Sequence, residues 1–271
     1  MSSIDPRDFP EGFVIPTDPI QEAAQILANA QNILFITGAG LSADSGLAIF
    51  RGPGGLYENG CIEGVPIGEA LSGPYFRQDP SLLWRWFAPS GRNMSSGRPN
   101  RGHEVITLFE QHRERVWVLT QNVDGFHTAA GSKNVIEIHG NMHRLLCVSC
   151  SYTVTVEDYS GLEIPPKCPD CAGVVRPNIV LFGENLPVDA TEARERELQQ
   201  GFEVLMYVGT TALFPYIFDP ILEARRQEEV RTIEINPTDT QFTRFFDVKI
   251  ALGAAEALDA IWDILSEQQS S

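Results

Sequence analysis

Residues 32–43 read NILFITGAGLSA, a short apolar run that leads directly into a glycine-rich turn. The run has the length and the hydrophobicity of a strand that is buried on both faces of a parallel sheet. Gly38 and Gly40 let the backbone turn sharply and approach a pyrophosphate closely, as in nucleotide-binding α/β folds. Because such turns also occur without a ligand, the segment alone leaves a nucleotide site and a plain tight turn as alternatives.

Similar apolar runs recur along the chain, with helical patterns between several of them. Strands that alternate with helices predict an α/β fold with a Rossmann-like parallel sheet and helices on both of its faces. The further expected strands are residues 116–120, 135–138, 204–208 and 232–235. The expected helices include residues 21–30, 103–112 and 219–227.

Two stretches depart from this alternation. Residues 52–101 are rich in Gly and Pro and contain a small aromatic helix around Trp84 and Trp86, whereas residues 141–177 hold four of the five cysteines. We interpret them as a helical insertion and a zinc-ribbon module that together form a smaller domain. The main, nucleotide-binding domain is then expected to comprise residues 1–51, 102–140 and 178–271.

The cysteines of the second insertion form two close pairs. Cys147 and Cys150 are followed, after seventeen residues, by Cys168 and Cys171. Two such pairs supply four thiolates for tetrahedral zinc, at the separation typical of structural zinc ribbons, and the alternatives are free thiols or disulfides. An odd number of cysteines, with Cys61 left over, favours a reducing compartment and a metal over a disulfide framework. Because the protein supplies all four ligands, we predict one structural Zn²⁺ and no catalytic metal.

Composition restricts the partners. The 271 residues are 43% hydrophobic, which is enough for one substantial core. A formal net charge of −16 disfavours nucleic acid and anionic membranes and suits basic or lysine-bearing partners, although many proteins are acidic for solubility alone. No apolar stretch approaches the roughly 18 residues of a membrane span and no secretion signal is visible. A cytoplasmic protein is therefore expected, or a nuclear one if the source is eukaryotic.

Polar residues follow the second and third expected strands. Gln121, Asn122 and Asp124 come directly after the second, and His139 comes after the third. Ligands bind at the carboxyl ends of strands in open α/β folds, so these side chains are candidates for a site. Asn and Asp in such places are also common as plain turn formers or helix caps.

A histidine at this edge can act as a base near neutral pH. His127 and His143 are close in sequence, so chemistry alone does not choose among the three. The position after a strand favours His139, whereas His127 is expected in a helix that follows the Asp124 turn.

Hydride transfer is not expected. A dehydrogenase of this class needs a second strand that ends in an acidic residue about 20 positions after the glycines. Residues 51–60 have no strand pattern.

The motifs follow one another in a defined order along residues 25–262. They are Gly38-Ala39-Gly40 with Ser42, Gly46 and Phe50-Arg51; Thr120-Gln121-Asn122-Val123-Asp124 with His127; His139-Gly140; the cysteine pairs; Arg176-Pro177-Asn178-Ile179-Val180-Leu181-Phe182-Gly183-Glu184; Val208-Gly209-Thr210-Thr211; and Glu234-Ile235-Asn236. This series resembles the sirtuins, which are NAD-dependent protein lysine deacylases.

The resemblance implies that acyl-lysine and NAD meet between the two domains. The acyl oxygen would attack the nicotinamide ribose carbon and nicotinamide would leave. His139 would then deprotonate a ribose hydroxyl so that the alkylamidate intermediate collapses. The products would be nicotinamide, free lysine and O-acyl-ADP-ribose.

The resemblance also implies roles for individual residues. Asn122 and Asp124 would join His139 in catalysis. NAD would be contacted by Gly38, Ala39, Gly40, Ser42, Phe50, Arg51, Gln121, Asn122, Asp124, Gly209, Thr210, Thr211 and Asn236. The substrate backbone would pair as an added strand with Val180, Phe182, Gly183 and Glu184.

Some residues depart from the family pattern. Residues 52–57 are similar to the branch that acts on acidic acyl groups, yet Phe87 and Ser90 stand where that branch carries Tyr and Arg. Without a phenol and a guanidinium, a succinyl carboxylate has no evident partner, unless Arg92 replaces them. The stretch 212–215 is one residue shorter than the family pattern.

Two other functions remain open. An NAD hydrolase or ADP-ribosyltransferase on the same fold would keep the glycine turn, Asn122 and His139, but would need neither a substrate strand nor a zinc ribbon. A scaffold that only binds a nucleotide would need no base at His139. The deacylase accounts for all of these features together.

Overall fold

The computed structural model describes residues 18–47, 60–227 and 229–269. Within these residues a parallel sheet of six strands has the order β11-β10-β9-β1-β4-β5. The strands are β1 (Asn32–Thr37), β4 (Arg115–Thr120), β5 (Val135–Glu137), β9 (Val204–Val208), β10 (Arg231–Ile235) and β11 (Val248–Ile250). The predicted α/β fold is confirmed.

The strands form because their apolar runs are buried on both faces. Every residue of β9 is buried, and so are the last five residues of β1. These two strands lie side by side in the middle of the sheet, with Ile33 opposite Val204 and Thr37 opposite Val208. Strands of this kind read as continuous hydrophobic segments, and for this reason they are visible in the sequence.

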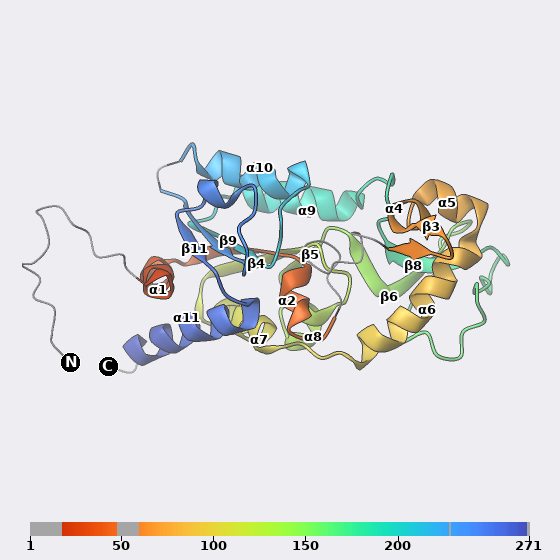
Figure 1. Cartoon of the computed structure of the whole chain (residues 1–271), viewed down its shortest axis with the longest axis horizontal. Helices are drawn as coiled ribbons and strands as arrows, with labels where there is room; N and C mark the ends of the chain where they lie inside the picture. The colour runs from red at the N-terminus through yellow and green to blue at the C-terminus, as the bar shows by residue number, and fades with distance from the viewer. Residues whose placement is uncertain (1–17, 48–59, 228, 270–271) are drawn as a thin grey trace, which may run out of the picture.

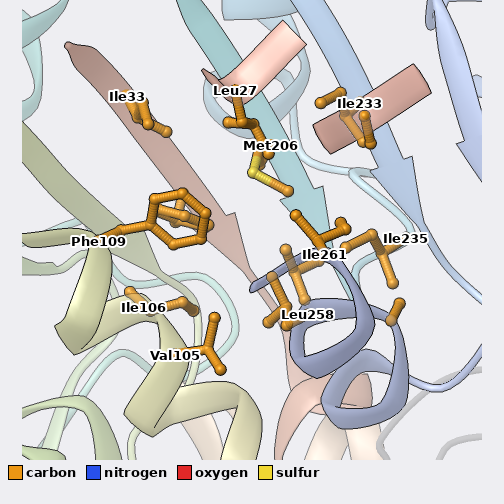
Figure 2. Packing of buried hydrophobic residues seen from close by; sticks show 14 of the residues in the cluster. Leu27, Ile33, Val105, Ile106, Phe109, Met206, Ile233, Ile235, Leu258 and Ile261 are labelled. Atoms are coloured by element: carbon orange, nitrogen blue, oxygen red, sulfur yellow. The ribbon is translucent and has the colours of Figure 1, made fainter. Parts of the chain in front are cut away.

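Helices cover both faces of the sheet (Figure 1). On one face α1 (Pro19–Asn29), α7 (Arg101–His112) and α11 (Ala254–Gln269) share a hydrophobic core with the strands. Figure 2 shows Phe109 of α7, Ile33 of β1, Ile261 of α11 and Met206 of β9, which all belong to this core. On the other face lie α9 (Val188–Gln199) and α10 (Pro215–Ala224).

The strand order creates a switch point between β1 and β9. From β1 the chain continues to β4 and β5 on one side, and it later returns to β9, β10 and β11 on the other side. In open α/β sheets a ligand binds outside the carboxyl ends of the strands at such a point. The glycine turn after β1 lies at this point, next to the turn that follows β9.

A second core lies at the far end of the molecule, to the right in Figure 1. It contains residues of both predicted insertions together with Ile179 and Leu181, and Trp84 connects the two insertions because its indole Nε1 donates to the carbonyl oxygen of Val175 at 2.8 Å. Its elements are β2 (Cys61–Ile62), β3 (Val65–Pro66), α4 (Ile67–Ala70), α5 (Gly73–Gln78), α6 (Pro80–Ser96), β6 (Gly140–Cys147), β7 (Thr153–Thr155) and β8 (Val175–Ile179).

Several elements differ from their sequence predictions. The helix expected at residues 219–227 begins earlier, at Pro215, because proline suits the first turn of a helix. The short edge strand β11 was not predicted. The aromatic helix α6 extends over 17 residues.

Two short helices follow β1 and β4, and the first of them carries the site residues Ala39, Gly40 and Ser42. They are α2 (Ala39–Ala43) and α8 (Phe126–Ala130), and a 3-10 turn, η2, covers Thr243–Phe245. Among the described residues, no helix is both long enough and apolar enough to cross a membrane.

Candidate functional site

Glycines at the ends of β1 and β9 pack directly against each other. The amide of Gly40 donates to the carbonyl oxygen of Gly209 at 2.8 Å. A Cβ atom on Gly40 would lie 2.7 Å from Gly209 Cα, and one on Gly38 would lie 2.7 Å from Thr210 Cβ. Gly209 has a φ of 61°, and a Cβ there would lie 2.4 Å from the amide of Leu41. Contact between the two turns therefore requires these glycines.

Side chains from the ends of β4 and β10 meet the turn after β9. Gln121 Nε2 donates to Thr210 Oγ1 at 2.8 Å and to the Thr37 carbonyl at 3.2 Å. Asn236 Nδ2 donates to the carbonyl oxygen of Thr210 at 3.3 Å. Amide and hydroxyl groups thus gather at the switch point. These groups have the donors and acceptors that suit the hydroxyls and the carboxamide of a nicotinamide nucleotide.

Asn122, Ser42 and Asp124 form one hydrogen-bond network. Asn122 Nδ2 lies 3.0 Å from both the Gly38 carbonyl oxygen and Ser42 Oγ. The Ser42 hydroxyl donates to Asp124 Oδ2 at 2.7 Å, and the Phe126 amide donates to Oδ1 at 2.9 Å. The network fixes Asn122 and Asp124 against the glycine turn.

Asp124 is only 5% exposed. Burial raises its pKa, and the hydrogen bonds from Phe126 and Ser42 oppose this shift because they stabilise the carboxylate. The Ser42 hydroxyl therefore links the charge of Asp124 to the position of Asn122.

His139 follows β5 and is partly buried. Its Nδ1 lies 3.0 Å from the carbonyl oxygen of Gln121, which can only accept a hydrogen bond. In the neutral ring Nδ1 therefore carries the proton, and Nε2 is the basic nitrogen. Burial lowers the pKa of His139, and the hydrogen bond to Gln121 partly opposes this shift. The imidazole is thus held neutral and able to accept a proton.

The two neighbouring histidines have other surroundings. His127 lies in α8, as predicted, and is 2% exposed with its Nε2 2.9 Å from Thr37 Oγ1. Burial lowers its pKa well below the ordinary value. His143 on β6 places Nε2 3.2 Å from the Asp124 carbonyl oxygen and Nδ1 3.1 Å from that of Glu157. His127 is almost fully enclosed and His143 bonds main-chain carbonyls, whereas His139 follows β5 at the carboxyl edge of the sheet, where ligands bind in this class of fold.

The predicted substrate segment begins beside His139. The Val180 amide donates to the His139 carbonyl at 2.9 Å. Further along, the Phe182 amide donates to the Leu71 carbonyl at 3.0 Å, and the Gly73 amide donates to the Phe182 carbonyl at 2.9 Å. Because both backbone groups of Phe182 are paired within the chain, an added strand has to use other backbone groups of this segment.

The end of that segment is a tight turn. Gly183 has a φ of 78°, in the left-handed region that favours glycine. The Glu184 carboxylate accepts two hydrogen bonds from the Arg176 guanidinium, at 2.6 and 3.0 Å, and a third from the Leu181 amide at 2.9 Å. Its side chain therefore holds the turn in shape.

The four paired cysteines converge. Their sulfur atoms all lie within 4.8 Å of one another, with 3.5 Å between Cys147 and Cys171 and between Cys150 and Cys168. Tetrahedral zinc with bonds of about 2.3 Å would separate its sulfur ligands by about 3.8 Å, whereas a disulfide would bring two of them to about 2.0 Å. The residues thus fit the predicted zinc ion.

The remaining predicted residues fall into two groups. Ala39 is the first residue of α2, and Thr211 directly follows Thr210. Phe50 and Arg51 lie outside the described residues. One site residue was missed by sequence reasoning. The Tyr216 hydroxyl lies 2.6 Å from His139 Nε2, and the only signal was the shortened stretch before it.

Comparison with known proteins gives a consistent result. The Sir2 family model matches residues 38–214. A curated relative from Pseudomonas aeruginosa, named NAD-dependent protein deacylase 2, is 47% identical over 251 residues, covering 92% of this chain and 96% of the relative. One from Aquifex aeolicus, named NAD-dependent protein deacylase, is 37% identical over 246 residues, covering 89% of this chain and 98% of the relative.

Solved structures of Sir2 proteins have the same fold as this chain. A Sir2 homologue in complex with NAD superposes with a TM-score of 0.81 at 31% identity, covering 92% of this chain and 94% of the other. A Sir2 variant with a deacetylated p53 peptide and 3′-O-acetyl ADP-ribose gives a TM-score of 0.79 at 29% identity, covering 90% and 98%. With the same motifs on the same fold, the chain belongs to the Sir2 family, the sirtuins.

Proposed function

We propose that this chain removes acyl groups from protein lysines at the expense of NAD, producing nicotinamide, free lysine and O-acyl-ADP-ribose. The observation that carries the proposal is the position of His139. Its neutral ring places a basic Nε2, which is hydrogen-bonded to the Tyr216 hydroxyl, at the same sheet edge as the glycine turn, and its own carbonyl is bonded to Val180 of the substrate segment. The names of the curated relatives support the same activity.

Each polar group then has a task. NAD, when bound, supplies the ribose carbon that receives the acyl oxygen and the nicotinamide that leaves. His139 accepts the proton of a ribose hydroxyl. Asn122 and Asp124, held by Ser42, orient the nicotinamide and its ribose. Gln121 contacts the ribose.

Backbone and small groups hold the rest of the nucleotide. The bare glycines after β1 and β9 let the pyrophosphate approach the main chain. The phosphates and adenosine are contacted by Gly38, Ala39, Gly40, Ser42, Gly209, Thr210, Thr211 and Asn236. Phe50 and Arg51 are expected to close over the cofactor.

The acyl-lysine substrate would lie along Val180, Phe182, Gly183 and Glu184 by strand addition. Phe87 is 5% exposed and packs edge-on against Trp86 at 4.8 Å between ring centroids. An apolar ring there offers no partner for a carboxylate, which supports acetyl and other uncharged acyl groups over succinyl.

The remaining architecture supports this activity indirectly. We propose that residues 52–101 and 141–177 form the small domain, which the zinc ion stabilises. The net charge of −16 argues against nucleic acid and membrane partners, and a cytoplasmic location is consistent with the unpaired cysteines that zinc requires.

The test incubates the purified protein with NAD and, in parallel, acetyl-, succinyl- and long-chain acyl-lysine peptides. Nicotinamide and deacylated peptide are followed by mass spectrometry. The expected result is release of the two in equal amounts, only when an acyl peptide is present. His139→Ala should abolish deacylation, whereas His112→Ala, an exposed change on α7, should not.

Release of nicotinamide without any peptide would contradict the deacylase and identify an NAD hydrolase or transferase on the same fold. Absence of NAD turnover, with NAD binding retained, would instead identify a binding protein.

A further inference from the structure

Tyr216, the second residue of α10, contacts the predicted base directly. Its hydroxyl oxygen lies 2.6 Å from His139 Nε2. The Gln121 carbonyl holds the proton of the neutral ring on Nδ1, so Nε2 can only accept. Burial raises the pKa of Tyr216 to about 12, so the phenol keeps its proton at neutral pH. The phenol is therefore the donor in this bond.

The position of Tyr216 is fixed by several contacts. Arg194 Nε donates to its carbonyl oxygen at 2.8 Å. Its ring stacks on Phe214 with an interplanar angle of 10° and a centroid distance of 5.4 Å. Both aromatic rings stand edge-on to His139, at centroid distances of 5.5 Å for Phe214 and 5.9 Å for Tyr216. The shortened stretch after β9 thus places the stacked rings of Phe214 and Tyr216 against His139.

This arrangement limits how a substrate can reach the base. Nε2 has a single lone pair in the plane of the ring, and the phenol already uses it. A substrate hydroxyl has either to displace Tyr216 or to bond to the phenol oxygen, which can accept one hydrogen bond while it donates another. Because the backbone and the ring of Tyr216 are both held, the second route requires no rearrangement.

We propose that Tyr216 relays the proton from the substrate hydroxyl to His139. The hydroxyl O–H bond breaks and its proton moves to the Tyr216 oxygen, while the phenolic proton moves to Nε2. The substrate oxygen keeps the electron pair, Tyr216 is regenerated, and His139 becomes an imidazolium that still donates from Nδ1 to Gln121. This relay rests on the proposed deacylase function.

The first test separates the proton transfer from the step before it. Tyr216→Phe keeps the ring stacked on Phe214 and removes only the hydroxyl. We expect deacylation to fall about 100-fold, at the lower end of the usual contribution of general acid–base catalysis. Exchange of labelled nicotinamide into NAD, which precedes the proton transfer, should persist. Tyr152→Phe in the zinc module is the matched control and should change neither rate.

An equal loss of exchange and deacylation would overturn the relay in favour of a purely structural role. An unchanged or faster deacylation would overturn it as well, because Tyr216 would then merely cover the base.

A second test uses the free protein and needs no turnover. Diethyl pyrocarbonate modifies unprotonated imidazole nitrogens, and peptide mass spectrometry reads each histidine separately. His139 should react faster in Tyr216→Phe than in the wild type, with exposed His112 as the internal reference. Equal reactivity of His139 in both proteins would show that the phenol does not hold Nε2 and would overturn the relay. Because this measurement needs no catalytic turnover, its outcome does not depend on whether the protein is a deacylase.

Discussion

At the scale of single residues, burial acts on two histidines with different results. His127 is enclosed in α8 and its Nδ1 has no hydrogen-bond partner among the described residues, so its charged form is strongly disfavoured. His139 is less enclosed and retains the carbonyl of Gln121 as a partner. The first ring is a neutral structural group, and the second is neutral and is the base in the proposed mechanism.

The lowered pKa of His139 predicts the pH profile. In the proposed mechanism activity requires the neutral imidazole of His139, so activity is lost as pH falls through the pKa of this group in the folded protein. Because burial lowers that pKa, the acidic limb of kcat/KM should lie below about pH 6.5, the ordinary value for histidine. Initial rates measured across a series of buffers would check this, and a limb above that value would contradict it.

At the scale of elements, helix α7 carries a buried titratable group in its first turn. His103 is fully buried, and its ring lies 5.0 Å from that of His127. Burial lowers the pKa of His103 to about 4. Asn100 caps the helix and lies 3.0 Å from His103 Nδ1, so the cap and the neutral histidine form one unit.

His103 should make the fold sensitive to acid. Below about pH 6.5 the His103 side chain binds a proton in the unfolded chain but not in the folded chain. The free energy of unfolding therefore falls as the pH is lowered towards the pKa of His103 in the folded protein. At about pH 5 the cost is about 2 kcal/mol. Urea unfolding of the wild type and of His103→Gln, which cannot titrate, would measure this. The wild type should lose more stability on acidification, and parallel losses would contradict the assignment.

Elements were predictable where one physical signal dominates. The central strands are continuous apolar runs, and β1 has the predicted bounds. The edge strand β11 has only three residues, too few for a pattern. The start of α10 depends on Pro215 rather than on periodicity, so the predicted helix began four residues late. Strand ends could be aligned from sequence, but the approach of Tyr216 to His139 spans 77 residues and has no local signal.

At the scale of the whole molecule, there are separate hydrophobic cores for the sheet and for the small module. The cysteine spacing predicted the metal site, since four thiolates near one another have few other uses. The partners of Glu184 were not predictable in this way. Its carboxylate binds Arg176 within the same segment, a contact that depends on the turn at Gly183.

Removal of zinc should destabilise the core of the small module and leave the core of the sheet unchanged. Metal binding stabilises the fold of the module that supplies the ligands. A chelator, or Cys150→Ser, should raise hydrogen exchange in β6, β7 and β8 while β1 and β9 stay protected. Metal analysis should give one zinc per chain in the wild type and in Cys61→Ser, whose cysteine is exposed and separate from the cluster. A uniform rise of exchange across both cores would contradict this division.

The interlocked glycines after β1 and β9 restrict how this enzyme can be redesigned. A methyl group at Gly40 or Gly209 would overlap main-chain atoms of the opposite turn, so neither position can change alone without separating the two central strands. Attempts to alter nucleotide preference by substituting this loop should yield unfolded protein before they yield new specificity. The productive positions for directed evolution are the replaceable side chains around it, such as Gln121 and Asn236.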